Sequence, residues 1–158
     1  MARLRLIHRL LRRFAELESS KRLLLAEALL GLIRARASLA FVSFPGLAQR
    51  LGTLVAPTGS PRETPNTQLD PAQISIAQDV SWAVTRAARY APFKAVCLPQ
   101  AMAAHRMLSR RGVASTMHFG AGRRDGNDLD AHAWLDAAGV EVTGYPVDER
   151  LAEIACFI

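Results

Sequence analysis

Cysteine is scarce in this chain, because among its 158 residues only Cys97 and Cys156 carry a thiol. Two cysteines are too few for a disulfide framework or for a cysteine-rich zinc site. The sequence also lacks a CxxC pair, an HExxH motif and a glycine loop followed by Lys and Ser or Thr. We therefore expect no metal and no other cofactor.

Long hydrophobic runs are lacking as well. The longest, residues 23–33, contains Glu27, and its roughly 11 residues fall short of the about 20 that span a bilayer. The first 14 residues are basic and amphipathic, without the uninterrupted apolar core of a secretory signal. We therefore expect a cytoplasmic protein. The basic segment would also suit a membrane surface, but membrane association is not expected.

Lysine is nearly absent, with two Lys against 18 Arg, and the positive charge is unevenly distributed. Residues 1–50 hold ten basic residues and three Glu, a net charge of +7, whereas residues 51–158 have a net charge of −1. A basic face suits an acidic partner, a membrane surface or a nucleic acid, and it can equally be a solvated face. No nucleic-acid motif accompanies it, so nucleic acid is not expected as a partner.

Hydropathy and composition divide the chain into three parts. Residues 1–55 are basic and Leu-rich, with helical spacing at the start and a strongly apolar helix over about 21–41. Residues 56–69 hold three prolines among Gly, Ser, Thr and Asn, and they predict a loop. Residues 70–158 form the expected catalytic core.

Two helices begin this core. Asp70 and Pro71 predict a helix start, and Pro92 stops that helix after about Tyr90. Its inward side chains are expected to be Ile74, Ala77, Val80, Val84 and Ala87. The next helix is expected to start at Cys97 and to end with Gly112 as its C-cap.

After Gly112 the pattern changes to that of strands. Residues 113–119 suit a strand and residues 120–130 a turn-rich loop. Residues 131–136 and 140–145 predict a hairpin that turns near Ala138 and Gly139, and the tail is a helix or a final strand. Helices followed by an antiparallel sheet indicate an α+β fold.

Cys97 and His132 carry the candidate chemistry. A helix N-terminus stabilises a thiolate, and its free N–H groups can donate to an oxyanion. A strand histidine facing such a cysteine can activate the thiol and later protonate a leaving amine. Cys156, near the end of the chain, is expected to be a packed core residue.

The two motifs resemble a known family. CLPQAMAAHRMLSRRGV followed by AHAWLDAAGVEV is similar to the papain-like, transglutaminase-type fold, and more narrowly to the lasso peptide biosynthesis B2 proteins. The basic helix, the Leu-rich helix and FPGLAQRLG extend the resemblance over nearly the whole chain. It implies a cysteine protease with Cys97 as nucleophile and His132 as base and acid.

The third catalytic residue follows less directly from the sequence. The transglutaminase-type pattern has an Asp that aligns close to Gly144, which has no side chain, while Tyr145 is expected across the hairpin from His132. Asp136 lies roughly 13 Å from His132 along the strand, which is too far. We expect Asp148, just past the strand, with Asp130 as the alternative.

The resemblance implies removal of a leader peptide from a lasso peptide precursor. The implied partners are the precursor, a separate leader-binding B1 protein and a lasso cyclase. Alternatives are a transglutaminase or acyltransferase with the same Cys–His chemistry, or a non-catalytic module that binds a partner through its basic helices.

Overall fold

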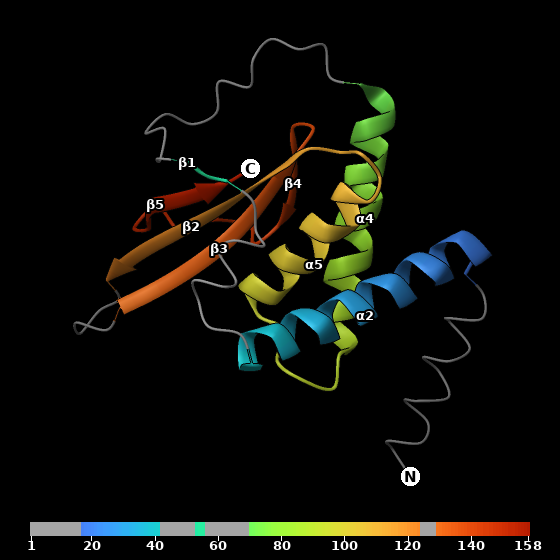
Figure 1. Ribbon diagram of the computed structural model, residues 1–158, viewed down its shortest axis with the longest axis horizontal. Helices are drawn as coiled ribbons and strands as arrows, with labels where there is room; N and C mark the ends of the chain where they lie inside the picture. Colours follow the sequence, from blue (N-terminus) through green and yellow to red (C-terminus); the bar gives the residue numbers. More distant parts are fainter. Residues whose placement is uncertain (1–16, 42–52, 56–69, 124–128) are drawn as a thin grey trace.

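The computed structural model describes residues 17–41, 53–55, 70–123 and 129–158 (Figure 1). Within these residues the helices are α2 (Ser19–Phe41), α4 (Pro71–Tyr90) and α5 (Cys97–Ser109). The strands are β1 (Leu54–Val55), β2 (Ser115–Arg123), β3 (Leu129–Ala137), β4 (Val140–Thr143) and β5 (Ala152–Phe157). They form one antiparallel sheet in the order β1-β5-β2-β3-β4, so the predicted α+β class is confirmed.

The helices cover one face of the sheet. Helix α5 packs against β2, β3 and β4, α4 packs against α5 and β4, and α2 crosses both helices (Figure 1). The core between them is built mainly of small and aliphatic side chains, with Leu32, Leu108, Met117 and Leu135 the largest that are fully buried.

Both core helices begin where the sequence predicts and α4 also ends there, but α5 ends at Ser109 with Arg110 as its C-cap, so the predicted C-cap at Gly112 is wrong. The carboxylate of Asp70 accepts a hydrogen bond from the backbone N–H of Ala72 at 2.9 Å, and Pro71 is the first helical residue of α4. Of the five side chains expected to face inward on α4, four are buried and Ile74 is half-buried. Helix α5 begins at Cys97, and Gly112 takes the left-handed conformation with φ +69° just beyond its end.

Helix α2 begins at Ser19, two residues before the predicted start. Its Ala28 and Leu32 are fully buried in the core shared with α4 and α5, whereas Leu23 is 73% exposed. The carboxylate of Glu27 binds Arg111 at 2.6 Å and thereby ties α2 to the end of α5. The helix predicted at the start of the chain and the loop predicted over 56–69 lie outside the described residues.

The hairpin of β2 and β3 is longer than predicted, so the loop expected over residues 120–130 is wrong at both ends. The two strands pair from Ser115 opposite Ala137 to Arg123 opposite Leu129. The glycines at 120 and 122 are paired residues of β2, and close neighbours on the sheet leave no room for a side chain at either position. A Cβ at 120 would lie 2.8 Å from the ring of Trp134, and one at 122 would lie 2.6 Å from the Arg150 carbonyl oxygen.

The second hairpin turns at Ala138 and Gly139, which have φ of 48° and 75°, so the predicted turn is confirmed. Strand β4 ends at Thr143 rather than at 145, because Gly144 takes a φ of 85° and leaves the extended conformation. The tail forms strand β5, which lies between β1 and β2.

Candidate active site

The N-terminus of α5 provides the candidate nucleophile. Cys97 is the first residue of the helix and is half-buried, after an extended Val96 whose side chain makes no capping hydrogen bond. The first helical hydrogen bond at this end is donated by the backbone N–H of Gln100 to the Val96 carbonyl at 3.3 Å. Pro99 has no N–H, so the N–H groups of Cys97 and Leu98 are the donors that this helix end offers to an anion.

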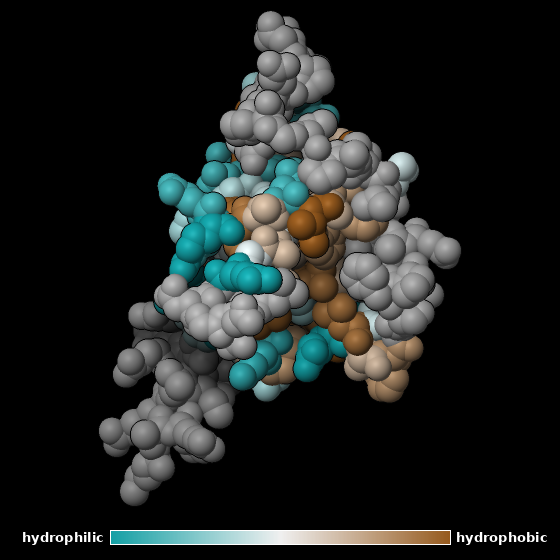
Figure 2. Space-filling view, turned by 90° about the vertical axis from the view of Figure 1, so that its left-hand side faces the viewer, coloured by the Kyte–Doolittle hydropathy of each residue, from teal (hydrophilic) through white to brown (hydrophobic). Residues whose placement is uncertain are grey.

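The segment before Cys97 is held by a side chain of the same helix. The amide of Gln100 donates to the carbonyl of Ala95 at 2.6 Å, which fixes the chain two residues before the thiol. Val96 is 57% exposed, so the approach to Cys97 is lined by an apolar residue. The side of the molecule on which α5 begins carries a band of hydrophobic surface flanked by hydrophilic side chains (Figures 1 and 2).

His132 lies in β3, half-buried and opposite Gly120 of β2. Its Nε2 is 2.6 Å from the carbonyl oxygen of Gly144. A carbonyl oxygen only accepts hydrogen bonds, so the imidazole must be the donor and its proton is on Nε2. The lone pair of the neutral ring is therefore on Nδ1, and Nδ1 is the atom that can act as a base.

Gly144 lies close to the position at which the resemblance described above implies an aspartate. A Cβ at this residue would lie 2.4 Å from the carbonyl oxygen of Ala133 and 2.8 Å from the Cα of Trp134, and its φ is +85°. No other residue fits here without a shift of the backbone. The close approach brings a main-chain carbonyl to the imidazole in place of a carboxylate.

Alternation along β3 assigns His132 to one face of the sheet. Leu135 and Ala137 belong to the core under the helices, so Trp134 and Asp136 face the other side. His132 shares that side, and its ring stacks near Trp134 with a centroid distance of 6.1 Å. Strand β4 pairs with β3 only as far as Leu135, so His132 lies on an edge of the sheet.

Cys97 and His132 therefore come from different layers, the helix layer and the sheet. His132 contacts Gly144 and Trp134. Its pairing with Cys97 stays a prediction. Such a pair requires that the Cys97 thiol reach Nδ1 of His132 around the edge of β3 that β4 leaves uncovered. Tyr145, expected across from His132, lies beyond the end of β4, so that expected pairing is wrong.

Asp148 and Asp130 lie near Arg150. The exposed carboxylate of Asp148 accepts hydrogen bonds from the Arg150 guanidinium, the shortest at 2.6 Å, and from its backbone N–H at 3.0 Å. These hydrogen bonds and the charges of Asp148 and Asp130 raise the pKa of Arg150. The role of Asp148 as the orienting residue stays a prediction.

Sequence reasoning missed a cluster of titratable groups around His118. Its Nδ1 lies 2.6 Å from Glu153 and its Nε2 lies 3.0 Å from Asp136, and its ring stacks on Trp134 at 5.4 Å. Burial opposes protonation of His118, but the hydrogen bonds and charges of Asp136 and Glu153 outweigh it and raise its pKa. Strand alternation alone could have placed His118, Trp134 and Asp136 on one face, but Glu153 comes from the tail.

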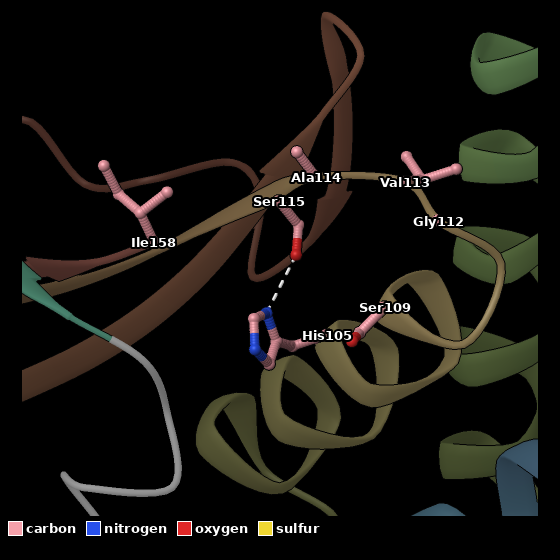
Figure 3. A pocket seen from close by; sticks show the side chains of 7 residues that line it. All are labelled: His105, Ser109, Gly112, Val113, Ala114, Ser115 and Ile158. Atoms are coloured by element: carbon pink, nitrogen blue, oxygen red, sulfur yellow. Dashed lines mark hydrogen bonds between the residues drawn. The ribbon is translucent and has the colours of Figure 1, made fainter.

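A separate hollow of about 320 Å³ lies near the C-terminal end of α5 (Figure 3). Its lining consists of His105, Ser109, Gly112, Val113, Ala114, Ser115 and Ile158. The Nδ1 of His105 forms a 2.8 Å hydrogen bond with the hydroxyl of Ser115, and burial lowers the pKa of this histidine. His105 therefore binds Ser115, and it lies eight residues beyond Cys97, about 12 Å along the helix.

Cys156, the second thiol, is 5% exposed, as expected for a packed residue, and burial raises its pKa. In the described part of the chain, no group of three or more His, Cys, Asp or Glu side chains is arranged to hold a metal ion. Within the same part, no helix has the length and apolarity needed to cross a bilayer.

Comparison with known proteins gives one family. The sequence profile of the transglutaminase-like superfamily matches residues 31–156, which covers the second half of α2, all of α4 and α5, and the sheet except the last residue of β5. Neither a curated protein nor a solved structure matches the chain significantly.

Proposed function

Because this chain belongs to the transglutaminase-like superfamily, whose members are usually cysteine peptidases or acyltransferases, we propose that it is a cysteine peptidase that removes the leader from a lasso peptide precursor. The observation that carries the proposal is the 2.6 Å hydrogen bond between Nε2 of His132 and the Gly144 carbonyl. This hydrogen bond places a proton on Nε2, so Nδ1 is the ring nitrogen that can take a proton from a thiol.

The proposed reaction uses the two layers together. Nδ1 of His132 accepts the proton of the Cys97 thiol, and the thiolate attacks the carbonyl carbon at the junction of leader and core. The oxyanion accepts hydrogen bonds from the N–H groups of Cys97 and Leu98. The imidazolium then gives its proton to the departing amine of the core, and water hydrolyses the leader thioester.

The group that orients the imidazole is the second part of the proposal. The Gly144 carbonyl is favoured by its 2.6 Å hydrogen bond to Nε2. A carbonyl is neutral, so it stabilises an imidazolium less than a carboxylate does. Asp148, expected from the sequence, is the competing candidate, and Asp148→Ala separates the two because it removes the carboxylate and leaves the carbonyl in place.

The proposed partners follow from the resemblance to B2 proteins. A leader-binding B1 protein would present the precursor, and a cyclase would receive the freed core. The basic N-terminal region is the proposed contact surface. On α2 this region offers exposed Arg34 and Arg36 beside exposed Leu30 and Ile33, a combination that suits an acidic partner with apolar anchors.

Cleavage of the precursor in the presence of the B1 protein, followed by mass spectrometry, tests the proposal. We expect Cys97→Ala and His132→Ala to abolish release of the leader, and the matched control Cys156→Ala to cut as the wild type does. Asp148→Ala should retain cleavage if the Gly144 carbonyl orients the ring. Cleavage by Cys97→Ala would disprove the proposal, and a leader joined to an added amine would assign the chain to acyl transfer instead.

A further inference from the structure

The segment that follows β4 is fastened to β3 at two separate points. At the first, the Gly144 carbonyl accepts the Nε2 proton of His132. At the second, the hydroxyl of Tyr145 donates a hydrogen bond to the carboxylate of Asp136. His132 and Asp136 are four residues apart on the same face of β3, roughly 13 Å along the strand, and the adjacent residues Gly144 and Tyr145 reach one each.

The second attachment is itself buried and braced. Asp136 is only 5% exposed, and its other oxygen lies 3.0 Å from Nε2 of His118 on β2. His118 is held in turn by Glu153 of β5 at 2.6 Å. Three strands thus converge on the carboxylate that receives the tyrosine hydroxyl, and a buried carboxylate with such partners has little freedom to move.

Gly144 has no side chain that could hold its carbonyl in place. Its φ of +85° belongs to a region that glycine adopts without strain, so the orientation of the peptide depends on its neighbours. Rotation of the peptide plane that joins Gly144 and Tyr145 would turn the carbonyl oxygen away from Nε2. Holding the tyrosine ring at Asp136 restricts that rotation.

We propose that Tyr145 and Asp136 are positioning residues for His132, which act by fixing the Gly144 carbonyl that keeps the imidazole proton on Nε2. The proposal deepens the proposed function and rests on it, because it assumes that His132 is the base. In this chain a tyrosine, a carboxylate and a main-chain carbonyl together do the orienting that a single aspartate would do by a direct hydrogen bond.

The test compares the only two tyrosines of the chain. Tyr145→Phe removes the hydroxyl and keeps the ring, and Tyr90→Phe makes the same change at a half-exposed residue at the end of α4. In ¹H–¹⁵N spectra of the whole protein, the Nε2–H of His132, assigned by its loss in His132→Gln, should be a slowly exchanging signal. We expect Tyr145→Phe to lose it and Tyr90→Phe to keep it.

Two further measurements separate positioning from general damage. Asp136→Ala should lose the same signal, while thermal melting reports whether each variant is folded. With precursor, Tyr145→Phe should lower kcat about tenfold with little change in KM, because a misaligned base slows chemistry rather than binding.

The outcomes distinguish the two proposals. A retained Nε2–H signal in folded Tyr145→Phe and Asp136→Ala would overturn the positioning role, even if Cys97→Ala and His132→Ala abolish cleavage and so support the peptidase. The spectra need no substrate, so they test whether Tyr145 and Asp136 hold the imidazole independently of any activity measurement. Cleavage of precursor by Cys97→Ala would overturn the proposed peptidase function and would leave the result of the spectra unchanged.

Discussion

The two faces of the sheet differ in what they bury. Under the helices, β2 and β3 contribute Met117, Leu135 and Ala137 to an apolar core. On the opposite face, the alternate residues of the same strands are His118, Trp134 and Asp136, which bind one another and Glu153. One face therefore stabilises the fold by excluding water, and the other by pairing charges that titrate.

This difference assigns separate tasks to the two faces. Changes to the apolar side chains under the helices should alter stability with little dependence on pH, because apolar burial does not titrate. Changes on the opposite face should alter pH dependence and the state of His132, because the cluster reaches the imidazole through Tyr145 and Gly144. The following variants break or sharpen that comparison.

Leu135→Ala should have the largest effect on stability. The side chain is fully buried, and removing it leaves a cavity that costs about 2–5 kcal/mol in the free energy of unfolding. The matched control is Leu23→Ala on α2, where the leucine is 73% exposed and the cost should stay below about 0.5 kcal/mol. Urea denaturation measures both free energies of unfolding, and equal costs would contradict the burial of Leu135 in the core under the helices.

Gly144→Ala should cost about 1–3 kcal/mol and should also displace the carbonyl that binds His132. The control Gly112→Ala has a similar positive φ of 69° but nothing within 4 Å of the added Cβ. It therefore carries the backbone strain without the collision at Ala133. If both variants lost equal stability and Gly144→Ala kept its precursor cleavage, the close approach at Gly144 would have no role.

His118→Gln should cost about 1–3 kcal/mol, because it leaves buried Asp136 and half-buried Glu153 without the imidazole that binds them. The folded protein raises the pKa of His118, so its stabilisation is present below the unfolded pKa and is lost as pH rises through the folded pKa. The cost of the substitution should thus be larger at pH 5.5 than at pH 8.5, as measured by denaturation at both values.

His105→Gln should show the opposite trend on the helix side of the sheet. Burial lowers the pKa of His105, so the folded protein favours the neutral ring and loses stability as the pH falls. The cost of removing it should therefore be smaller at pH 5.5 than at pH 8.5. Parallel trends for the two histidines would contradict the contrast between the faces.

Glu27→Gln should have the smallest effect, below about 1 kcal/mol, because its ion pairs with Arg110 and Arg111 are partly exposed. The hydrogen bond from Arg111 is the main cause that lowers the pKa of Glu27. Its stabilisation is present above the unfolded pKa and is lost as pH falls below about 4. Thermal melting at pH 7 and pH 3 should therefore separate the variant from the wild type only at pH 7.

Local signals in the sequence predicted the helices well. The cap at Asp70, the stop at Pro92 and the helix start at Cys97 depend on residues next to one another in the chain, so propensity alone identifies them. The glycines at 120 and 122 predict a loop by composition, because their fit in a strand depends on Trp134 and Arg150, which are distant in sequence.

The candidate site could be predicted in the same uneven way. Cys97 and His132 stand in recognisable motifs at a helix start and in a strand. The hydrogen bond from His132 to Gly144 was not predictable, because a main-chain acceptor leaves no side chain for a pattern to show. The cluster around His118 was missed because its second carboxylate comes from β5, whose neighbours depend on the tertiary fold.

The pairing of Cys97 with His132 is the central claim, and the rate of alkylation of Cys97 as a function of pH tests it most directly. Transfer of the Cys97 proton to Nδ1 of His132 gives a thiolate paired with an imidazolium, which reacts at pH values below the ordinary thiol pKa of about 8.5, and buried Cys156 should not react there. We predict that the wild type is alkylated rapidly at pH 6 and that His132→Gln loses this low-pH reactivity by about tenfold or more. Identical profiles for the two proteins would contradict the account.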